Sequence, residues 1–252
     1  MKTALDLDEK RRGPMSHHTD GTDGEIVTYL RQTYGRRLPG LTQGSFSFSI
    51  AEWQKWLPGT LAPGLLRLPE ELDGTVSRES LATLATLASN DLGRKRVLLA
   101  TLIWGRGRKN QRLLPGHVAA LSNPALGKAL RQSARLIESG RPGDAYVAWQ
   151  VAHIGGLGEA FFTKWFFAAG LRGVPSTSLT PLTLDARVWL ALGRLGWSSE
   201  RASGFKYSRT PAAGYCAYLA AASRWATALS TAANPVSAEQ VELLLFNNAK
   251  GI

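Results

Sequence analysis

Apolar residues recur three and four positions apart along most of the chain after residue 24, which is the spacing of one helix face. In 25–34, for example, Ile26, Leu30 and Tyr34 follow this spacing, whereas strand-like alternation is limited to 45–49. The pattern therefore predicts an all-α fold. The expected helices cover 25–34, 49–56, 77–89, 92–104, 124–138, 143–153, 159–169, 185–195, 212–230 and 239–248.

Local signals mark some helix ends and the remaining segments. Asn123-Pro124 places a capping residue before a proline at the first helical position, and residues 237–240 read as a capping box. The Pro- and Gly-rich segment 57–75 is expected to be a loop. Residues 1–24 are polar and lack periodicity, which predicts a disordered tail before one all-α domain over 25–252.

The charge balance indicates the class of partner. The chain has 30 basic and 19 acidic residues, a net charge of +11, which favours a polyanion such as nucleic acid. An anionic membrane surface is the alternative, but the basic residues cluster with glycines rather than along one helix face. No apolar stretch reaches the roughly 18 residues of a bilayer span. We therefore expect DNA and not a membrane.

The metal-binding residue types are sparse. Cys216 is the single cysteine, which leaves no internal disulfide and favours a reducing cytoplasm. His17, His18, His117 and His153 are scattered without metal-ligand spacing. We therefore expect no metal and no cofactor.

A glycine-rich turn separates two predicted helices within residues 144–170. Gly155, Gly156 and Gly158 permit a tight reversal and close approach of another molecule to the backbone. The amide groups at the start of the second helix would attract a phosphate without reading base sequence. An ordinary pair of helices joined by a glycine turn gives the same pattern.

Lys164 stands alone as a charge within the aromatic run Phe161–Phe167. Because burial makes charge expensive, this lysine must either reach water or be held as a neutral amine. Desolvation can lower the pKa of a lysine from about 10.4, and the neutral amine is then a nucleophile.

Three short motifs together resemble one enzyme superfamily. Gly156-Leu157-Gly158, Phe162-Thr163-Lys164 and the segment 183–189 are similar to the helix-hairpin-helix, Gly-Pro-Asp DNA glycosylases, more narrowly to their bacterial and archaeal 8-oxoguanine glycosylase-like branch. The resemblance covers about 80–250 and is densest over 150–190. It includes a lysine and an aspartate, Asp185, that are 21 residues apart.

The resemblance implies roles for these two residues. In the family a lysine attacks the sugar carbon that bears the base and forms a Schiff base, and an aspartate steers it and stabilises positive charge on the sugar. Carried over, Lys164 is the nucleophile and Asp185 its partner. Asp185 would also cap the helix that follows it. In better-known animal members the lysine corresponds to Ala160, and of the Gly-Pro-Asp loop only Pro181 and Asp185 remain.

A basic loop follows the apolar helix that ends near residue 104. An enzyme that acts on a base must take it out of the stack and fill the gap. The resemblance assigns this to Asn110 with Arg106 or Arg108, while Lys109 and Arg112 would meet phosphate. A solvated basic loop is the alternative interpretation.

The base pocket needs aromatic faces, for which we name Trp104, Trp189 and Phe246, although such residues are more often part of the core than of a pocket. Further backbone contacts are expected from Arg201, Lys206 and Arg209.

Together these features predict a two-lobed all-α DNA glycosylase with the helix-hairpin-helix at the cleft. It would flip and excise a modified base from double-stranded DNA, by family default 8-oxoguanine, with strand cleavage as a further step. One alternative is a bacterial antiviral glycosylase that acts on a hypermodified cytosine, such as a glucosylated one. The other is a non-catalytic DNA-binding module. We expect a monomer that is cytoplasmic, bacterial and associated with the nucleoid.

Overall fold

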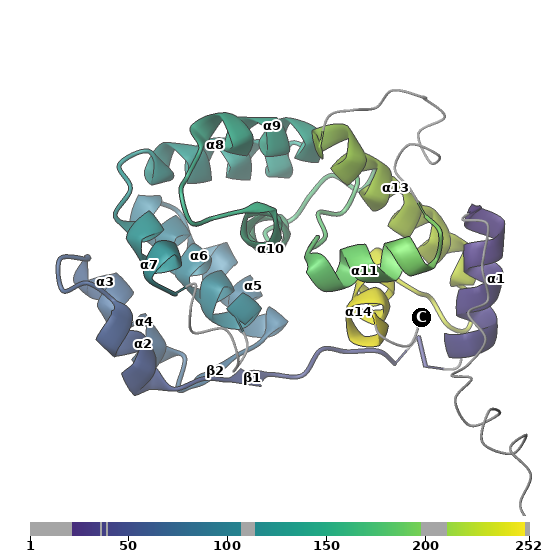
Figure 1. Ribbon diagram of the computed structural model, residues 1–252, viewed down its shortest axis with the longest axis horizontal. Helices are drawn as coiled ribbons and strands as arrows, with labels where there is room; N and C mark the ends of the chain where they lie inside the picture. Colours follow the sequence, from purple (N-terminus) through teal and green to yellow (C-terminus); the bar gives the residue numbers. More distant parts are fainter. Residues whose placement is uncertain (1–21, 36, 39, 107–113, 198–210, 250–252) are drawn as a thin grey trace, which may run out of the picture.

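The computed structural model describes residues 22–35, 37–38, 40–106, 114–197 and 211–249 (Figure 1). In this part of the chain thirteen helices and one two-stranded ribbon confirm the all-α prediction. The first four helices are α1 (Asp23–Tyr34), α2 (Ile50–Trp56), α3 (Pro63–Leu66) and α4 (Leu68–Glu71). Those that follow are α5 (Arg78–Leu87), α6 (Asp91–Arg106), α7 (Leu114–Leu121), α8 (Leu126–Glu138), α9 (Pro142–Ala152), α10 (Glu159–Gly170), α11 (Ala186–Arg194), α13 (Pro211–Leu229) and α14 (Ala238–Asn248).

Two expectations about local structure were wrong. The predicted loop 57–75 contains the one-turn helices α3 and α4, each of which has a proline in its first turn, where a missing N–H is tolerated. The sequence analysis also missed α7, because Pro115 and Gly116 interrupt its pattern. Only the first strand of the ribbon was anticipated, at 45–49. The ribbon pairs β1 (Phe46–Ser47) with β2 (Thr75–Val76) in antiparallel register.

Predicted helix starts agree with the structure where side chains cap them. Ser49 accepts a hydrogen bond from the backbone N–H of Glu52, and Ser237 and Gln240 form the expected capping box at the start of α14. The predicted start at Pro124 was wrong: Asn123 accepts from the N–H of Ala125, but α8 begins at Leu126, with Ala125 as its N-cap and no capping side chain.

The helices gather in two groups with α10 between them (Figure 1). One group contains α2 to α7 and the ribbon, and the other contains α1, α11, α13 and α14, while α8 and α9 lie along one side of both. The chain runs from α1 in one group to β1 in the other. None of the helices in the described ranges has the length and apolar character needed to cross a membrane.

The central helix α10 is buried along most of its length. Phe162, Trp165 and Phe166 are buried, and the indole Nε1 of Trp165 donates to Ser133 Oγ at 2.9 Å. A helix that is apolar on every side belongs in a protein core, and α10 has this composition except at Thr163, Lys164 and its first turn. The position of α10 therefore determines the environment of the lysine.

Candidate active site

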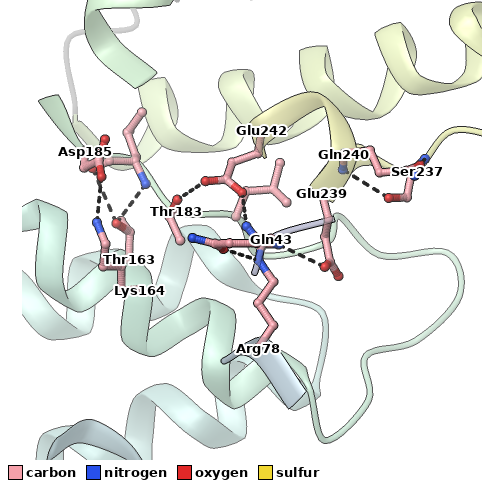
Figure 2. Close-up of polar contacts among 12 residues, drawn as sticks. Gln43, Arg78, Thr163, Lys164, Thr183, Asp185, Ser237, Glu239, Gln240 and Glu242 are labelled. Atoms are coloured by element: carbon pink, nitrogen blue, oxygen red, sulfur yellow. Dashed lines mark hydrogen bonds and ion pairs between the residues drawn. The ribbon is translucent and has the colours of Figure 1, made fainter. Parts of the chain in front are cut away.

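Lys164 and Asp185 form an ion pair inside the protein. Lys164 Nζ donates to Asp185 Oδ2 at 2.8 Å, and the two side chains are only 7% and 13% exposed (Figure 2). Burial of a lone charge is costly, so the carboxylate compensates for the burial of the amine. The two residues that the sequence analysis proposed as a pair are thus in direct contact.

The amine lies one helical turn before the Cα of its own residue. Side chains on a helix point towards its N-terminus, and Lys164 Nζ also donates to the carbonyl oxygen of Ala160 at 3.3 Å. The functional end of the side chain is therefore beside Ala160, near the start of α10.

Asp185 has two structural tasks at once. Its Oδ1 accepts from the backbone N–H groups of Arg187 and Val188 at 3.0 and 3.2 Å, which makes it the N-cap of α11. Its other oxygen binds Lys164. The helix cap fixes the carboxylate, and the free oxygen is then directed at the amine.

The segment before Asp185 is tied to the neighbouring helices. Thr163 Oγ1 donates to the Glu159 carbonyl at 2.8 Å and accepts from the Leu184 N–H at 3.0 Å. On the other side, the hydroxyls of Tyr215 and Tyr218 donate to the carbonyls of Leu182 and Thr183, at 2.9 and 3.1 Å. The extended segment is thereby held between α10 and α13, and Asp185 with it.

Gly105 is packed against the lysine stem. A methyl group built on Gly105 would lie 2.7 Å from Lys164 Cδ and 3.1 Å from its Cε. The end of α6 therefore approaches α10 closely only because residue 105 has no side chain. Helix α6 ends at Arg106, immediately after this contact.

The glycines of the hairpin have different surroundings. Gly156 has a φ of +83°, and a methyl group there would lie 2.3 Å from the carbonyl oxygen of Gly116 in α7. Around Gly155 and Gly158, in contrast, nothing in the described part of the chain lies within 4 Å of such a methyl group. Gly156 thus serves internal packing, and the open backbone is at Gly155 and Gly158.

The three aromatic residues proposed for the base pocket lie in different surroundings. Trp104 is 4% exposed and stacks on Phe167, with ring centroids 5.7 Å apart. Trp189 is 40% exposed, and its Nε1 donates to Glu159 Oε2 at 3.1 Å. Phe246 is partly buried, with the guanidinium of Arg187 4.5 Å from its ring centre.

Several predicted DNA contacts fall outside the described residues. Arg106 is the last residue of α6, and its side chain is among the parts that are not described. The remaining positions, Arg108, Lys109, Asn110, Arg112, Arg201, Lys206 and Arg209, lie in 107–113 and 198–210. Their roles stay predictions.

An open pocket of about 570 Å³ lies between the segment around β1 and the start of α14. It is lined by residues 41–45 and 77–79 and, from the start of α14, by Ser237, Glu239, Gln240 and Leu243. Trp104, Trp189 and Phe246 are not among these lining residues. Arg78 connects the pocket to α10, because its guanidinium lies 4.5 Å from the ring centre of Phe167.

Sequence reasoning missed the residues that hold the site together. Glu159 accepts from Tyr146 and Trp189 with its two oxygens, and Thr163 bonds to Leu184. An acidic residue in the first turn of a helix and a threonine next to the lysine were the available signals, but neither identifies a distant partner. For Gly105 no signal exists in the sequence, because the clash it avoids is with another helix.

Comparison with known proteins places the chain in a family. A family model described as "Putative 8-oxoguanine DNA glycosylase OGG-like protein" matches residues 39–246. The searches against curated proteins and against solved structures gave no match. The matched range includes α10, Lys164 and Asp185.

Proposed function

Because the chain belongs to this OGG-like family, we propose that it excises a modified base from DNA with Lys164 as the nucleophile. The observation that supports this role most directly is the contact between Lys164 Nζ and Asp185 Oδ2 at 2.8 Å, with both side chains nearly buried.

In the proposed reaction Lys164 first gives its ammonium proton to water, and Nζ then attacks C1′ of a nucleotide whose base has left the stack. A bond forms between Nζ and C1′, the bond from C1′ to the base breaks, and the base departs with a proton. The bond between C1′ and the ring oxygen O4′ then breaks, the one proton left on Nζ moves to O4′, and a double bond between Nζ and C1′ gives a Schiff base with an opened sugar. Asp185 stabilises the positive charge that develops on the sugar, which accelerates the reaction only if it favours the transition state over the ground state.

The hairpin and the net charge support DNA as the substrate. The open backbone at Gly155 and Gly158, next to the first amides of α10, suits contact with a phosphate. The net charge of +11 attracts a polyanion without regard to sequence. In this proposal the loop 106–112 fills the gap in the duplex.

For the base itself we propose the pocket lined by Gln43, Arg78 and Glu239. The family name suggests 8-oxoguanine. The second candidate is a cytosine that carries a sugar, and the lining residues favour it. The amide, hydroxyl and charged lining of the pocket provides both donors and acceptors for hydroxyl groups. An enzyme with that substrate would suit defence against phage DNA.

The experiment combines base release with covalent capture. The protein is incubated with duplexes that contain oxidised guanine or glucosylated hydroxymethylcytosine, borohydride is added, and released bases are identified by mass spectrometry. We expect one substrate to lose its base and a covalent adduct to form, which Lys164→Gln abolishes. Lys55→Gln is the matched control, because Lys55 is an exposed lysine on α2 and should leave the adduct unchanged.

The alternatives give different results. A non-catalytic binding module would bind duplex DNA in a salt-sensitive way and release no base from any substrate. Base release without an adduct would mean that water attacks C1′ and that Asp185 activates it. Strand cleavage that depends on Lys164 would show that the Schiff base proceeds to a lyase step.

A further inference from the structure

Arg78 joins three side chains at the edge of the pocket. Its Nε donates to Gln43 Oε1 at 2.8 Å, its Nη1 to Glu239 Oε2 at 3.1 Å and its Nη2 to Glu242 Oε2 at 2.5 Å (Figure 2). Only 17% of the side chain is exposed. Arg78 therefore connects the segment before the ribbon, the start of α5 and helix α14.

The same guanidinium contacts the helix that carries the nucleophile. It lies 4.5 Å from the ring centre of Phe167, which follows Lys164 by three residues on α10. Residues three apart are neighbours on a helix surface. The Arg78 guanidinium therefore contacts both the wall of the pocket and helix α10, which carries Lys164.

Glu242 continues this contact towards Asp185. It is 2% exposed, and its Oε1 accepts a hydrogen bond from the hydroxyl of Thr183, two residues before Asp185. Burial raises the pKa of Glu242, while the Arg78 guanidinium and the Thr183 hydroxyl act in the opposite direction. Arg78, Glu242 and Thr183 therefore form a continuous chain of side-chain contacts.

A buried carboxylate of this kind is hard to explain by stability alone. An apolar arrangement of similar volume is often as stable as a buried ion pair, or more stable. The contacts among Arg78, Glu242 and Thr183 instead fix the position of each side chain, because charge-assisted hydrogen bonds have defined distances and directions. Thr183 is also held at its carbonyl by Tyr218, so that both its side chain and its backbone are restrained.

We propose that Arg78, Glu242 and Thr183 form a positioning relay that holds Asp185 against Lys164 and couples this placement to the pocket. The proposal rests on the proposed function and extends it. The three residues act through Asp185 and do not touch the reacting atoms. A ligand in the pocket that contacts Arg78 would restrict the motion of Glu242. Through Glu242 it would also restrict Thr183 and the segment that ends at Asp185.

Two substitutions at residue 183 test the relay. Thr183→Val keeps the shape and removes the hydroxyl, while Thr183→Ser keeps the hydroxyl and removes a methyl group. We expect Thr183→Val to lower the rate of base release at saturating DNA by about 100-fold, the effect of a misplacement of about 1 Å, without a change in the Kd for DNA. Thr183→Ser should retain the wild-type rate. Equal rates in wild type and Thr183→Val, or equal losses in both variants, would overturn the relay.

Arg78→Lys extends the test to the pocket. Lysine keeps the charge but cannot serve three partners in fixed directions, so the rate should fall as in Thr183→Val. Arg96→Gln is the matched control, because Arg96 bonds to Glu71 and to the Gly64 carbonyl at a distance from this chain of contacts. It should leave the rate per folded molecule unchanged. Loss of rate in Arg96→Gln would mean that the assay reports stability.

A measurement without DNA separates failure of the relay from failure of the proposed function. Lysine amines are methylated with ¹³C-formaldehyde, and the NMR signal absent from Lys164→Gln is assigned to Lys164. If Asp185 moves in Thr183→Val, this signal shifts, whereas in Thr183→Ser it does not. A wild type that releases no base would refute the glycosylase proposal, and this signal would still decide whether the relay exists.

Discussion

Gly105 on α6 and Lys164 on α10 are in such close contact that a single methyl group at residue 105 would lie 2.7 Å from Lys164 Cδ. Real side chains do not approach so closely, so any larger residue must displace the lysine stem. The direction of the amine towards Asp185 thus depends on a glycine 59 positions away in the sequence.

Gly105→Ala should therefore impair the reaction more than the fold. The lysine stem is flexible, so the protein can relax around the added methyl group, but the amine then leaves its position beside Asp185. We expect a loss of about 100-fold in adduct formation with borohydride.

Gly193→Ala is the control. No described atom lies within 4 Å of its added methyl group, and alanine favours the helix, so activity should be unchanged and thermal stability slightly raised. Full activity of Gly105→Ala would show that Lys164 need not hold this position.

The two tasks of Asp185 can be separated with Asn and Ala. Asparagine caps helices about as well as aspartate, whereas alanine does not, and both remove the charge. Urea unfolding should therefore show Asp185→Ala to be less stable than Asp185→Asn by about 1 kcal/mol.

Base release should fall strongly in both Asp185 variants, because the cationic transition state loses its stabilisation. With DNA that already contains an abasic site, Asp185→Asn should still give a borohydride adduct, since no base has to be expelled. Lys164→Gln should give none on either substrate. Undiminished base release by Asp185→Asn would exclude the electrostatic role.

The hairpin glycines should divide into two classes. Gly156→Ala places a side chain at a φ of +83° and 2.3 Å from the Gly116 carbonyl, so the melting temperature should fall. Gly158→Ala meets no described atom within 4 Å and should leave the melting temperature unchanged while it weakens duplex binding. Unchanged DNA affinity in Gly158→Ala would indicate that the hairpin does not face the phosphates.

The raised pKa of Glu242 predicts a dependence of stability on pH. Because burial raises the pKa of this carboxyl above its ordinary value of 4.5, the folded state binds the proton more tightly than the unfolded state. The contribution of Glu242 is then fully present below pH 4.5 and is lost as the pH rises through the folded-state pKa. Urea unfolding of wild type and Glu242→Gln should show a stability difference that declines over this window. A difference that grows with pH would mean that Arg78 outweighs burial.

The sequence was informative about the site where its signals are local. Apolar spacing located α10, while the pairing of Lys164 with Asp185 came from the family resemblance, and the structure brings the two side chains to 2.8 Å. The role of Asp185 as a helix cap also followed from its position before an apolar run, because capping involves residues only two and three positions away.

The supporting contacts were not predictable because they join distant segments. Arg78 and Glu242 are 164 positions apart, and Thr183 and Glu242 are 59 apart. Nothing in the spacing of one segment indicates which charge of another it will meet. Trp104 shows the same limit, since its burial against Phe167 depends on the approach of α6 to α10.

Helix α1 lies outside the range matched by the family model, which begins at residue 39. It nevertheless packs on α13, where Asp23 accepts from Arg224 Nε at 2.7 Å and from Trp225 Nε1 at 2.8 Å. Ile26 and Leu30 are fully buried there. A fragment cut to the family boundary would consequently expose an apolar strip along α13 and leave an indole N–H without its carboxylate. Expression trials should for this reason retain the residues from Thr22 onward, since the shorter piece is expected to aggregate.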